Sequence, residues 1–356
     1  MFYMFIIVKL TKCMEGTVMK SRNWYVKQLK RKPVQITRYV IQAVFLLFLS
    51  YVGLQFYQFY QHFETLGKTA FVDRPSAVEG FLPISALVAL KVWLTSGEFD
   101  VIHPAGLVLL AFFVGSGILL RKTFCSWICP VGTANELIAW VGRKIFKRNF
   151  EIPQWLTWIL TPIKYLLLLF FLAMVVQLDT FSAKSFLVDP YNKISDVKML
   201  LLFLNIGGFT LKFIIVIFIL SLFFRNFWCR FLCPYGALIG LGSILRLTKV
   251  RRNEESCTNC EMCTKVCPQR IKVHTKQVVV SPNCTACMSC VEACPIKDTL
   301  NMTVVNKKVN KWFVPVTFFV LFIVVIGIAK ITGHWNTIIS YEEWKQLIPE
   351  ARNIGH

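Results

Sequence analysis

The sequence CTNCEMCTKVCP at residues 257–268 is followed by CTACMSCVEACP at residues 284–295. Both runs follow the spacing C-x2-C-x2-C-x3-C-P, which suits a cubane iron–sulfur cluster. Three thiolates on one tight loop can cap three irons of the cube, and the fourth iron takes the last Cys of the other run. The two runs therefore predict two 4Fe-4S clusters with exchanged fourth ligands.

The crossing assigns four thiols to each cluster. Cluster 1 takes Cys257, Cys260, Cys263 and Cys294, and cluster 2 takes Cys284, Cys287, Cys290 and Cys267. Zinc sites and disulfides are the alternatives. Zinc ligands come in two pairs, and disulfides need an oxidising compartment, so the doubled runs favour clusters.

About residues 250–305 resemble a two-cluster bacterial ferredoxin domain, which implies a small α+β fold of hairpins and short helices around the clusters. Within it we expect strands at Lys276–Val280 and Met302–Val305.

The composition is that of a membrane protein. Of 356 residues, 55% are hydrophobic and 17% are charged, and the mean hydropathy is +0.55. We therefore expect an α-helical integral membrane protein in contact with lipid. The net charge is +21, but no basic stretch carries a nucleic-acid motif, so nucleic acid is not an expected partner.

Apolar stretches of suitable length predict five transmembrane helices, and a shorter apolar run follows the first span and precedes the second. The five are 39–60, 104–120, 155–178, 209–224 and 312–331, and the re-entrant or surface-lying run is 81–94. The expected domains are a basic arm (1–38), a four-helix membrane domain (39–249), an inserted ferredoxin domain (250–311), the fifth helix (312–331) and a tail (332–356).

Lys and Arg set the expected orientation. Residues 1–38, 121–156 and 225–311 carry 29 of them, against 9 in the loops of the other side and the tail. Because cytoplasmic loops are enriched in these residues, we expect the N-terminus and both clusters in the cytoplasm and the tail outside. The expected location is the cytoplasmic (inner) membrane.

A second cysteine pattern is duplicated at a constant offset of 104 residues. Arg121, Cys125, Cys129, Pro130 and Gly132 match Arg225, Cys229, Cys233, Pro234 and Gly236. Repeats of one direction pack side by side about an axis along the membrane normal. We therefore expect the four thiols of the two C-x3-C-P turns to converge. They could ligate a shared metal or cluster or cycle as dithiols, and the sequence does not choose between these roles.

Two C-x3-C-P turns after membrane spans, followed by two ferredoxin motifs, resemble the NapH/NosR/CcoG family of membrane polyferredoxins over roughly residues 39–331. The chain looks like the members that contain only this core. The resemblance implies electron transfer between the quinone pool and a periplasmic or cytoplasmic redox partner in an anaerobic-type respiratory chain, with the chain as a component, such as a quinol dehydrogenase subunit. The alternatives are a metalloenzyme maturation factor that reduces metal through the C-x3-C-P thiols, and a redox sensor.

Polar residues near the short outer run are candidates for quinol oxidation, which needs a proton acceptor. They are Arg74, Glu79, Lys91 and His103. Ionisable groups near membrane depth often serve function, although loops also hold such residues. We expect Lys164, within the third span, to extend its amine to the aqueous cytoplasmic face, and His274 to lie at the surface.

Overall fold

The computed structural model describes residues 32–147, 150–245 and 247–355, so most of the predicted basic arm lies outside the described residues. The elements are mainly helical. In chain order they are α3 (Pro33–Glu64), η1 (Ser76–Phe81), α4 (Pro83–Ser96), α5 (Pro104–Leu120), α6 (Thr123–Trp127), α7 (Pro130–Phe146), α8 (Gln154–Leu160), α9 (Ile163–Gln177), α10 (Thr180–Val188), α11 (Pro190–Lys193), α12 (Ser195–Leu204), α13 (Gly208–Phe223), α14 (Phe227–Phe231), α15 (Pro234–Gly242), η2 (Ser243–Leu245), β1 (Thr248–Arg252), α16 (Met262–Val266), η3 (Val273–Thr275), β2 (Val278–Val279), α17 (Ser289–Ala293), β3 (Leu300–Val304), β4 (Lys307–Val309), α18 (Phe313–Ile331), α19 (Tyr341–Leu347) and η4 (Pro349–Arg352).

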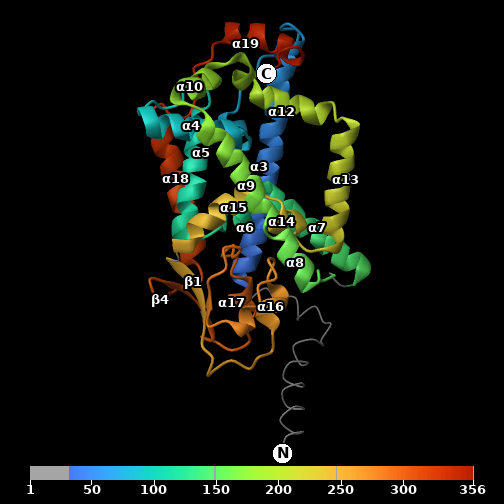
Figure 1. Cartoon of the computed structure of the whole chain (residues 1–356), viewed down its shortest axis with the longest axis vertical. Helices are drawn as coiled ribbons and strands as arrows, with labels where there is room; N and C mark the ends of the chain where they lie inside the picture. The colour runs from blue at the N-terminus through green and yellow to red at the C-terminus, as the bar shows by residue number, and fades with distance from the viewer. Residues whose placement is uncertain (1–31, 148–149, 246, 356) are drawn as a thin grey trace, which may run out of the picture.

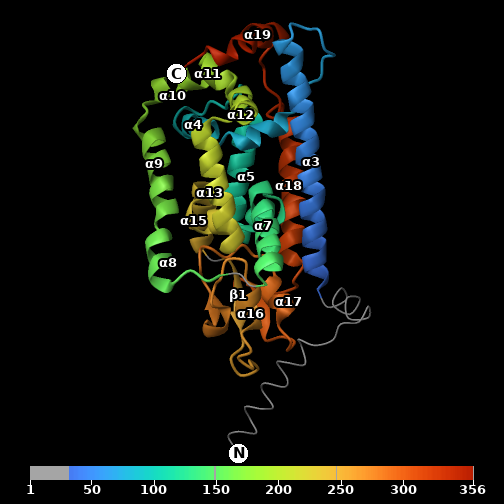
Figure 2. The same ribbon diagram turned by 90° about the vertical axis from the view of Figure 1, so that its right-hand side faces the viewer.

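The long helices run between two ends of the molecule. The strands, α16 and α17 lie at the end where α3 begins, and α10, α12 and α19 lie at the opposite end (Figure 1). Figure 2 shows α8 and α9 in one line at the side of the bundle, with α13 and α5 nearer its middle. The loops predicted for the two sides of a membrane thus separate in space, while the side that faces the cytoplasm stays a prediction.

Three helical segments of the described residues are long and apolar enough to span a bilayer. They are α3 with 32 residues, α8–α9 with 24 and α18 with 19. A fourth candidate is α12 with α13, which meet at 79°. α5 has 17 apolar residues and falls short of a span by length alone. The mostly helical fold is as predicted, and the count of five spans stays a prediction.

The offset of 104 residues extends beyond the cysteines. It relates α5 to α13 and α6 to α14, and α4 and α12 precede each copy on the same side of the bundle. Packing is exchanged between the copies: α5 contacts α15, and α13 contacts α7. Gly117 of α5 lies against Ile239 of α15, and at the equivalent positions Ser221 donates to Asn135 Oδ1 at 3.1 Å. The repeat is therefore symmetric in its contacts as well as in its sequence.

The short apolar run folds as α4, which packs against α5 and α10. Ala89 of α4, Leu107 of α5 and Ala183 of α10 are fully buried in one apolar cluster. The Lys91 Nζ donates to the carbonyls of Val175, Val176 and Leu178 at the end of α9. These carbonyls have no partner inside their own helix, so Lys91 caps α9.

Four antiparallel strands form one sheet in the order β2-β1-β3-β4. Val250 of β1 pairs with Val279 of β2 on one side and with Met302 of β3 on the other. Val305 and Asn306 form the two-residue turn between β3 and β4, and both have positive φ. A two-residue turn of this kind matches the right-handed twist of the flanking strands. The expected strands at 276–280 and 302–305 contain β2 and most of β3.

The ferredoxin-type region contacts the N-terminal end of the long helix α3. α3 has no side-chain cap of its own, and the N–H groups of Val34 and Gln35 instead donate to the Glu292 carboxylate at 3.1 and 2.9 Å. A carboxylate at a helix N-terminus also offsets the positive end of the helix dipole. Because Glu292 lies on α17 of the second cysteine run, this cap holds that run against the membrane helices.

Candidate functional site

The two ferredoxin-type runs fold into the same loop. Asn259 and Glu261 have φ of 53° and 60°, and their counterparts Ala286 and Met288 have φ of 48° and 59°. A short helix follows at once in each run, α16 and α17. A residue other than Gly adopts a positive φ only at a cost in free energy. Such strained conformations persist where the surrounding structure holds them in place, often at a binding site.

The first set of thiols draws on both runs. Cys257, Cys260 and Cys263 of the first run share one pocket with Cys294 of the second run. Burial raises the pKa of Cys263 and of Cys294, and neighbouring cysteines of this same set raise both further. Buried thiolates are costly on their own, so a set of this kind would suit a cationic iron centre.

The second set combines Cys284, Cys287 and Cys290 of the second run with Cys267 of the first run. Burial raises the pKa of Cys267 to about 12, and its next largest influence is Cys287, followed later by Cys284. Burial also raises the pKa of Cys290 well above its usual value, and Cys287, Cys267 and Cys284 raise it further. Cys263 of the first set also acts on Cys290, so the two sets adjoin each other.

Among the described residues, no three His, Cys, Asp or Glu side chains are placed to hold a single metal ion. A cubane cluster spreads its thiolates over four irons and does not require such convergence.

The two C-x3-C-P turns also share one local structure. The second Cys of each precedes a helix that begins with Pro, and its N–H donates five residues back: Cys129 to the Phe124 carbonyl at 3.1 Å and Cys233 to the Trp228 carbonyl at 3.0 Å. The Cys233 Sγ also accepts from the Gly236 N–H at 3.2 Å. The sulfur therefore sits at a helix N-terminus, where negative charge is favoured.

The structure brings these four cysteines together. Cys229 interacts electrostatically with Cys233, Cys129 and Cys125. Cys125 does so with Cys129 and Cys233, and Cys129 with Cys233. Each thiol is thus in electrostatic range of the other three, and each copy supplies two of them.

Two buried lysines border the four thiols. Lys122 is 2% exposed, acts on Cys125 and Cys229, and donates to the Gly236 carbonyl at 3.2 Å. Lys164 is 1% exposed and donates to Asn283 Oδ1 at 2.5 Å. The expectation that Lys164 extends into water was wrong, because the segment before Cys284 covers its amine. No local sequence pattern indicated that either lysine would lie beside these thiols.

The second ferredoxin-type run docks on the first C-x3-C-P turn. Ser126, next to Cys125, donates to the Thr285 carbonyl at 2.7 Å, and the Gln35 side chain donates to the Cys287 carbonyl at 2.6 Å. Arg121 is buried and donates to the carbonyls of Thr248, Val279 and Ser281 at 2.7–3.1 Å. The loop that carries the second thiol set is therefore held directly against the four-cysteine group.

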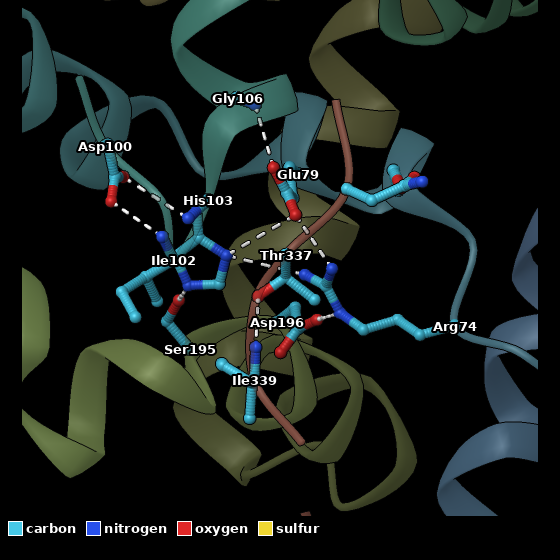
Figure 3. Close-up of polar contacts among 12 residues, drawn as sticks. Arg74, Glu79, Asp100, Ile102, His103, Gly106, Ser195, Asp196, Thr337 and Ile339 are labelled. Carbon is cyan, nitrogen blue, oxygen red and sulfur yellow. Dashed lines mark hydrogen bonds and ion pairs between the residues drawn. The ribbon is translucent and has the colours of Figure 1, made fainter. Parts of the chain in front are cut away.

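A further polar cluster lies at the other end of the helices (Figure 3). Arg74 donates from Nη1 to Glu79 and from Nε to Asp196, both at 2.7 Å. The His103 Nδ1 lies 3.7 Å from Glu79 Oε1, and its Nε2 lies 2.7 Å from the Asn192 carbonyl. Burial alone would lower the pKa of His103, but the hydrogen bond and charge of Glu79 reverse this and raise it.

Three of the four residues that the sequence suggested for this region meet there, and one does not. Arg74, Glu79 and His103 form the cluster, whereas Lys91 caps α9 instead. The sequence did not indicate Asp196, because it pairs with Arg74 across 122 positions. His274 is partly exposed and lies beside Thr264 and Glu261 of the first run.

A mostly helical chain with apolar helices and crossed thiols for iron–sulfur clusters defines a membrane-associated electron carrier. The family model "4Fe-4S binding domain" matches residues 102–149 and 206–253, one match on each C-x3-C-P copy. The model "4Fe-4S dicluster domain" matches residues 249–295.

Curated relatives agree with this class. "Putative electron transport protein YccM" of Escherichia coli is 40% identical over 90% of this chain and 91% of its own length. "Protein NirI" of Paracoccus denitrificans is 30% identical over 53% of this chain and 28% of its own length, and "Regulatory protein NosR" of Pseudomonas aeruginosa is 27% identical over 45% and 22%. The chain therefore belongs to the NosR/NapH-type family of membrane-associated, ferredoxin-type electron-transport proteins. No solved structure matches the chain.

Proposed function

We propose that the protein carries electrons between the quinone pool of the inner membrane and a redox protein partner, through iron–sulfur clusters on the cytoplasmic side. The observation that carries this proposal is the succession of three thiol groups. The four C-x3-C-P cysteines adjoin the loop of Cys284 and Cys287, and that second set adjoins the first. Electron tunnelling slows steeply with distance, so adjoining centres favour one route along the molecule.

Each ferredoxin-type set has the donors that a 4Fe-4S cluster needs. Cys257, Cys260, Cys263 and Cys294 would hold cluster 1, and Cys284, Cys287, Cys290 and Cys267 would hold cluster 2. A cluster supplies one-electron exchange when bound. The protein supplies burial and short loops that fix the thiols.

The four C-x3-C-P cysteines would hold a further iron–sulfur cluster shared between the two copies. Each copy offers two thiols, so neither copy alone could complete the ligand set. A family model described as a 4Fe-4S binding domain covers each copy. Lys122 places positive charge beside a site whose four thiolates would be negative, which would favour the reduced state of that site.

This shared site predicts non-additive mutations. Replacing any one of Cys125, Cys129, Cys229 and Cys233 by Ser should slow quinol-driven reduction of clusters 1 and 2 about as much as replacing all four, because members of one site act as a unit. The measurement is electron paramagnetic resonance of anaerobically purified protein after mixing with menadiol or decylubiquinol. Clusters 1 and 2 should still accept electrons from dithionite.

Iron analysis separates the alternatives. Clusters 1 and 2 account for about eight iron per chain, and the wild type should exceed the quadruple Ser variant by the iron of the shared cluster. Equal iron content in the wild type and the quadruple Ser variant, together with normal quinol-driven reduction, would show that the duplicated cysteines serve only in packing. Equal iron with slow reduction would favour a dithiol relay.

A further inference from the structure

A narrow cleft lies between η1, α4 and α5, and it reaches α15. Its lining includes Glu79, Leu82, Ala86, Leu109, Leu110 and Tyr235. Apart from Glu79 and Tyr235, the side chains of this lining are apolar. Gly80 and Pro83 of the same lining are exposed, so the cleft opens beside them. The cleft has an empty volume of about 190 Å³, which is smaller than a usual small-molecule pocket, so a ligand would enter it only in part.

One polar residue of the cleft adjoins the thiols. Tyr235 follows Cys233 by two positions, and Cys125, Cys129 and Cys233 all act on it electrostatically. Its ring lies 5.9 Å from that of Phe124, the residue before Cys125. Tyr235 therefore lines the cleft and is also within electrostatic reach of the four-cysteine group.

The other polar residue belongs to the cluster in Figure 3, and that cluster is short of one positive charge. Arg74 contributes one cation, whereas Glu79 and Asp196 contribute two carboxylates, all with side chains at most 4% exposed. With a neutral His103 the group carries about one net negative charge, which is unfavourable when buried. One added proton neutralises it.

The geometry also shows where that proton would rest. The His103 Nε2 lies 2.7 Å from the Asn192 carbonyl, which can only accept, so Nε2 carries a hydrogen. The remaining nitrogen, Nδ1, faces Glu79 Oε1 at 3.7 Å and Arg74 Nη2 at 3.4 Å. Protonation at Nδ1 gives Glu79 a second cationic partner. Asp100, the other carboxylate nearby, accepts from the backbone N–H groups of Ile102 and His103.

The geometry points to a quinol-oxidation site in this cleft, with Glu79 and His103 as the proton-accepting pair and Tyr235 on the side where electrons leave. This inference rests on the proposed function. A quinol that becomes a quinone releases two protons and two electrons. The two electrons pass singly to the iron–sulfur centres, which are the oxidant. The protons leave one after the other through Glu79 and His103.

An outward route for the protons begins at His103. The Ser195 Oγ lies 3.5 Å from His103 Nε2, and Ser195 is partly exposed at the end of the molecule that carries α19. Protons released there emerge on the side away from the ferredoxin-type runs. Oxidation at this site would therefore separate electrons and protons to opposite ends of the protein.

The first test compares two buried carboxylates. Glu79→Gln keeps the shape of the cluster and removes the acceptor, whereas Asp100→Asn changes a carboxylate that does not line the cleft. With decylubiquinol or menadiol as donor, Glu79→Gln should reduce the clusters at least about tenfold more slowly than wild type, in line with loss of a proton acceptor. Asp100→Asn should stay near wild type. Dithionite should reduce all clusters in both variants, which excludes misfolding.

The second test closes the cleft without touching a charge. Gly80→Ile adds a side chain that meets Leu109 in the cleft, whereas Gly115→Ile on α5 points into open space. Quinol-driven reduction should fall in the first variant and persist in the second. Wild-type protein that neither quinol reduces would overturn the proposed function itself. Wild-type protein that is reduced, with Glu79→Gln and Gly80→Ile equally active, would overturn only the placement of the site.

Discussion

At the scale of single residues, the two copies of the repeat differ at their shared glycine. A Cβ on Gly132 would lie 2.3 Å from the backbone carbonyl oxygen of Cys125, whereas a Cβ on Gly236 would meet the Cys233 Sγ at 3.5 Å, an ordinary contact. The sequence shows the same residue at both positions. Only the approach of the backbone distinguishes a required glycine from a tolerant one.

The pair gives a matched prediction. Gly132→Ala should lower the free energy of unfolding by about 2–4 kcal/mol, because backbone must move to relieve the clash. Gly236→Ala should change it by less than about 1 kcal/mol. Thermal unfolding in detergent measures both. If the two variants unfold alike, the turn is looser than the described contacts indicate.

The spacing of the eight cysteines was enough to predict a ferredoxin-type domain, which the dicluster family model matches, and it leads to the prediction of crossed ligands because spacing constrains how the cysteines can meet. The same kind of local pattern could not predict which side chains would pair with Arg74. Asp196 comes from a helix 122 positions away, and Lys91 turned to the open end of α9. Charge pairs of this kind depend on the packing of helices, which a local pattern does not specify.

At the scale of elements, the bounds of helices such as α5 could be predicted from the apolar stretches of the sequence, whereas strands such as β1 and β4 could not. α5 has the expected bounds Pro104–Leu120, since Pro starts it and Arg121 at positive φ ends it. β1 is the segment TKVRR, which reads as a basic loop, and β4 has three residues. Their pairing with β3 stabilises them, and neither could be predicted alone.

Arg121 and Arg225 occupy equivalent positions and yield a second matched prediction. Arg121 is fully buried and donates to three carbonyls of the sheet region, whereas Arg225 reaches one carbonyl, that of Lys265, at 3.5 Å. Arg121→Lys should weaken docking of the sheet by about 2–4 kcal/mol, because Lys cannot reproduce the planar fork of donors.

Hydrogen exchange of residues 248–309 measures this docking. Exchange should accelerate in Arg121→Lys and should change little in Arg225→Lys. A similar response of both variants would mean that the sheet is held by its other contacts, such as that of Glu292 with the start of α3.

At the scale of the whole molecule, the outer polar cluster and the three thiol groups are linked in succession by pairwise interactions. Glu79 and Tyr235 share the cleft, three thiols of the four-cysteine group act electrostatically on Tyr235, and Thr285 of the second run accepts a hydrogen bond from Ser126, next to Cys125. The first thiol set comes last, and its Cys263 acts electrostatically on Cys290 of the second set. This order follows from the exchanged packing of the two repeats, which the offset in the sequence indicated only in part.

The order of the centres can be tested by removing them one at a time. Cys284→Ser should abolish cluster 2 and leave cluster 1 with its four ligands. Cluster 1 should then lose reduction by menadiol, because its nearest donor is gone and tunnelling slows steeply with distance. Cys257→Ser should abolish cluster 1 and leave cluster 2 reducible at the wild-type rate. Freeze-quenched electron paramagnetic resonance distinguishes the clusters, and dithionite provides the control for intact sites. Cluster 1 reduced at the wild-type rate in Cys284→Ser would show that electrons reach it by another route.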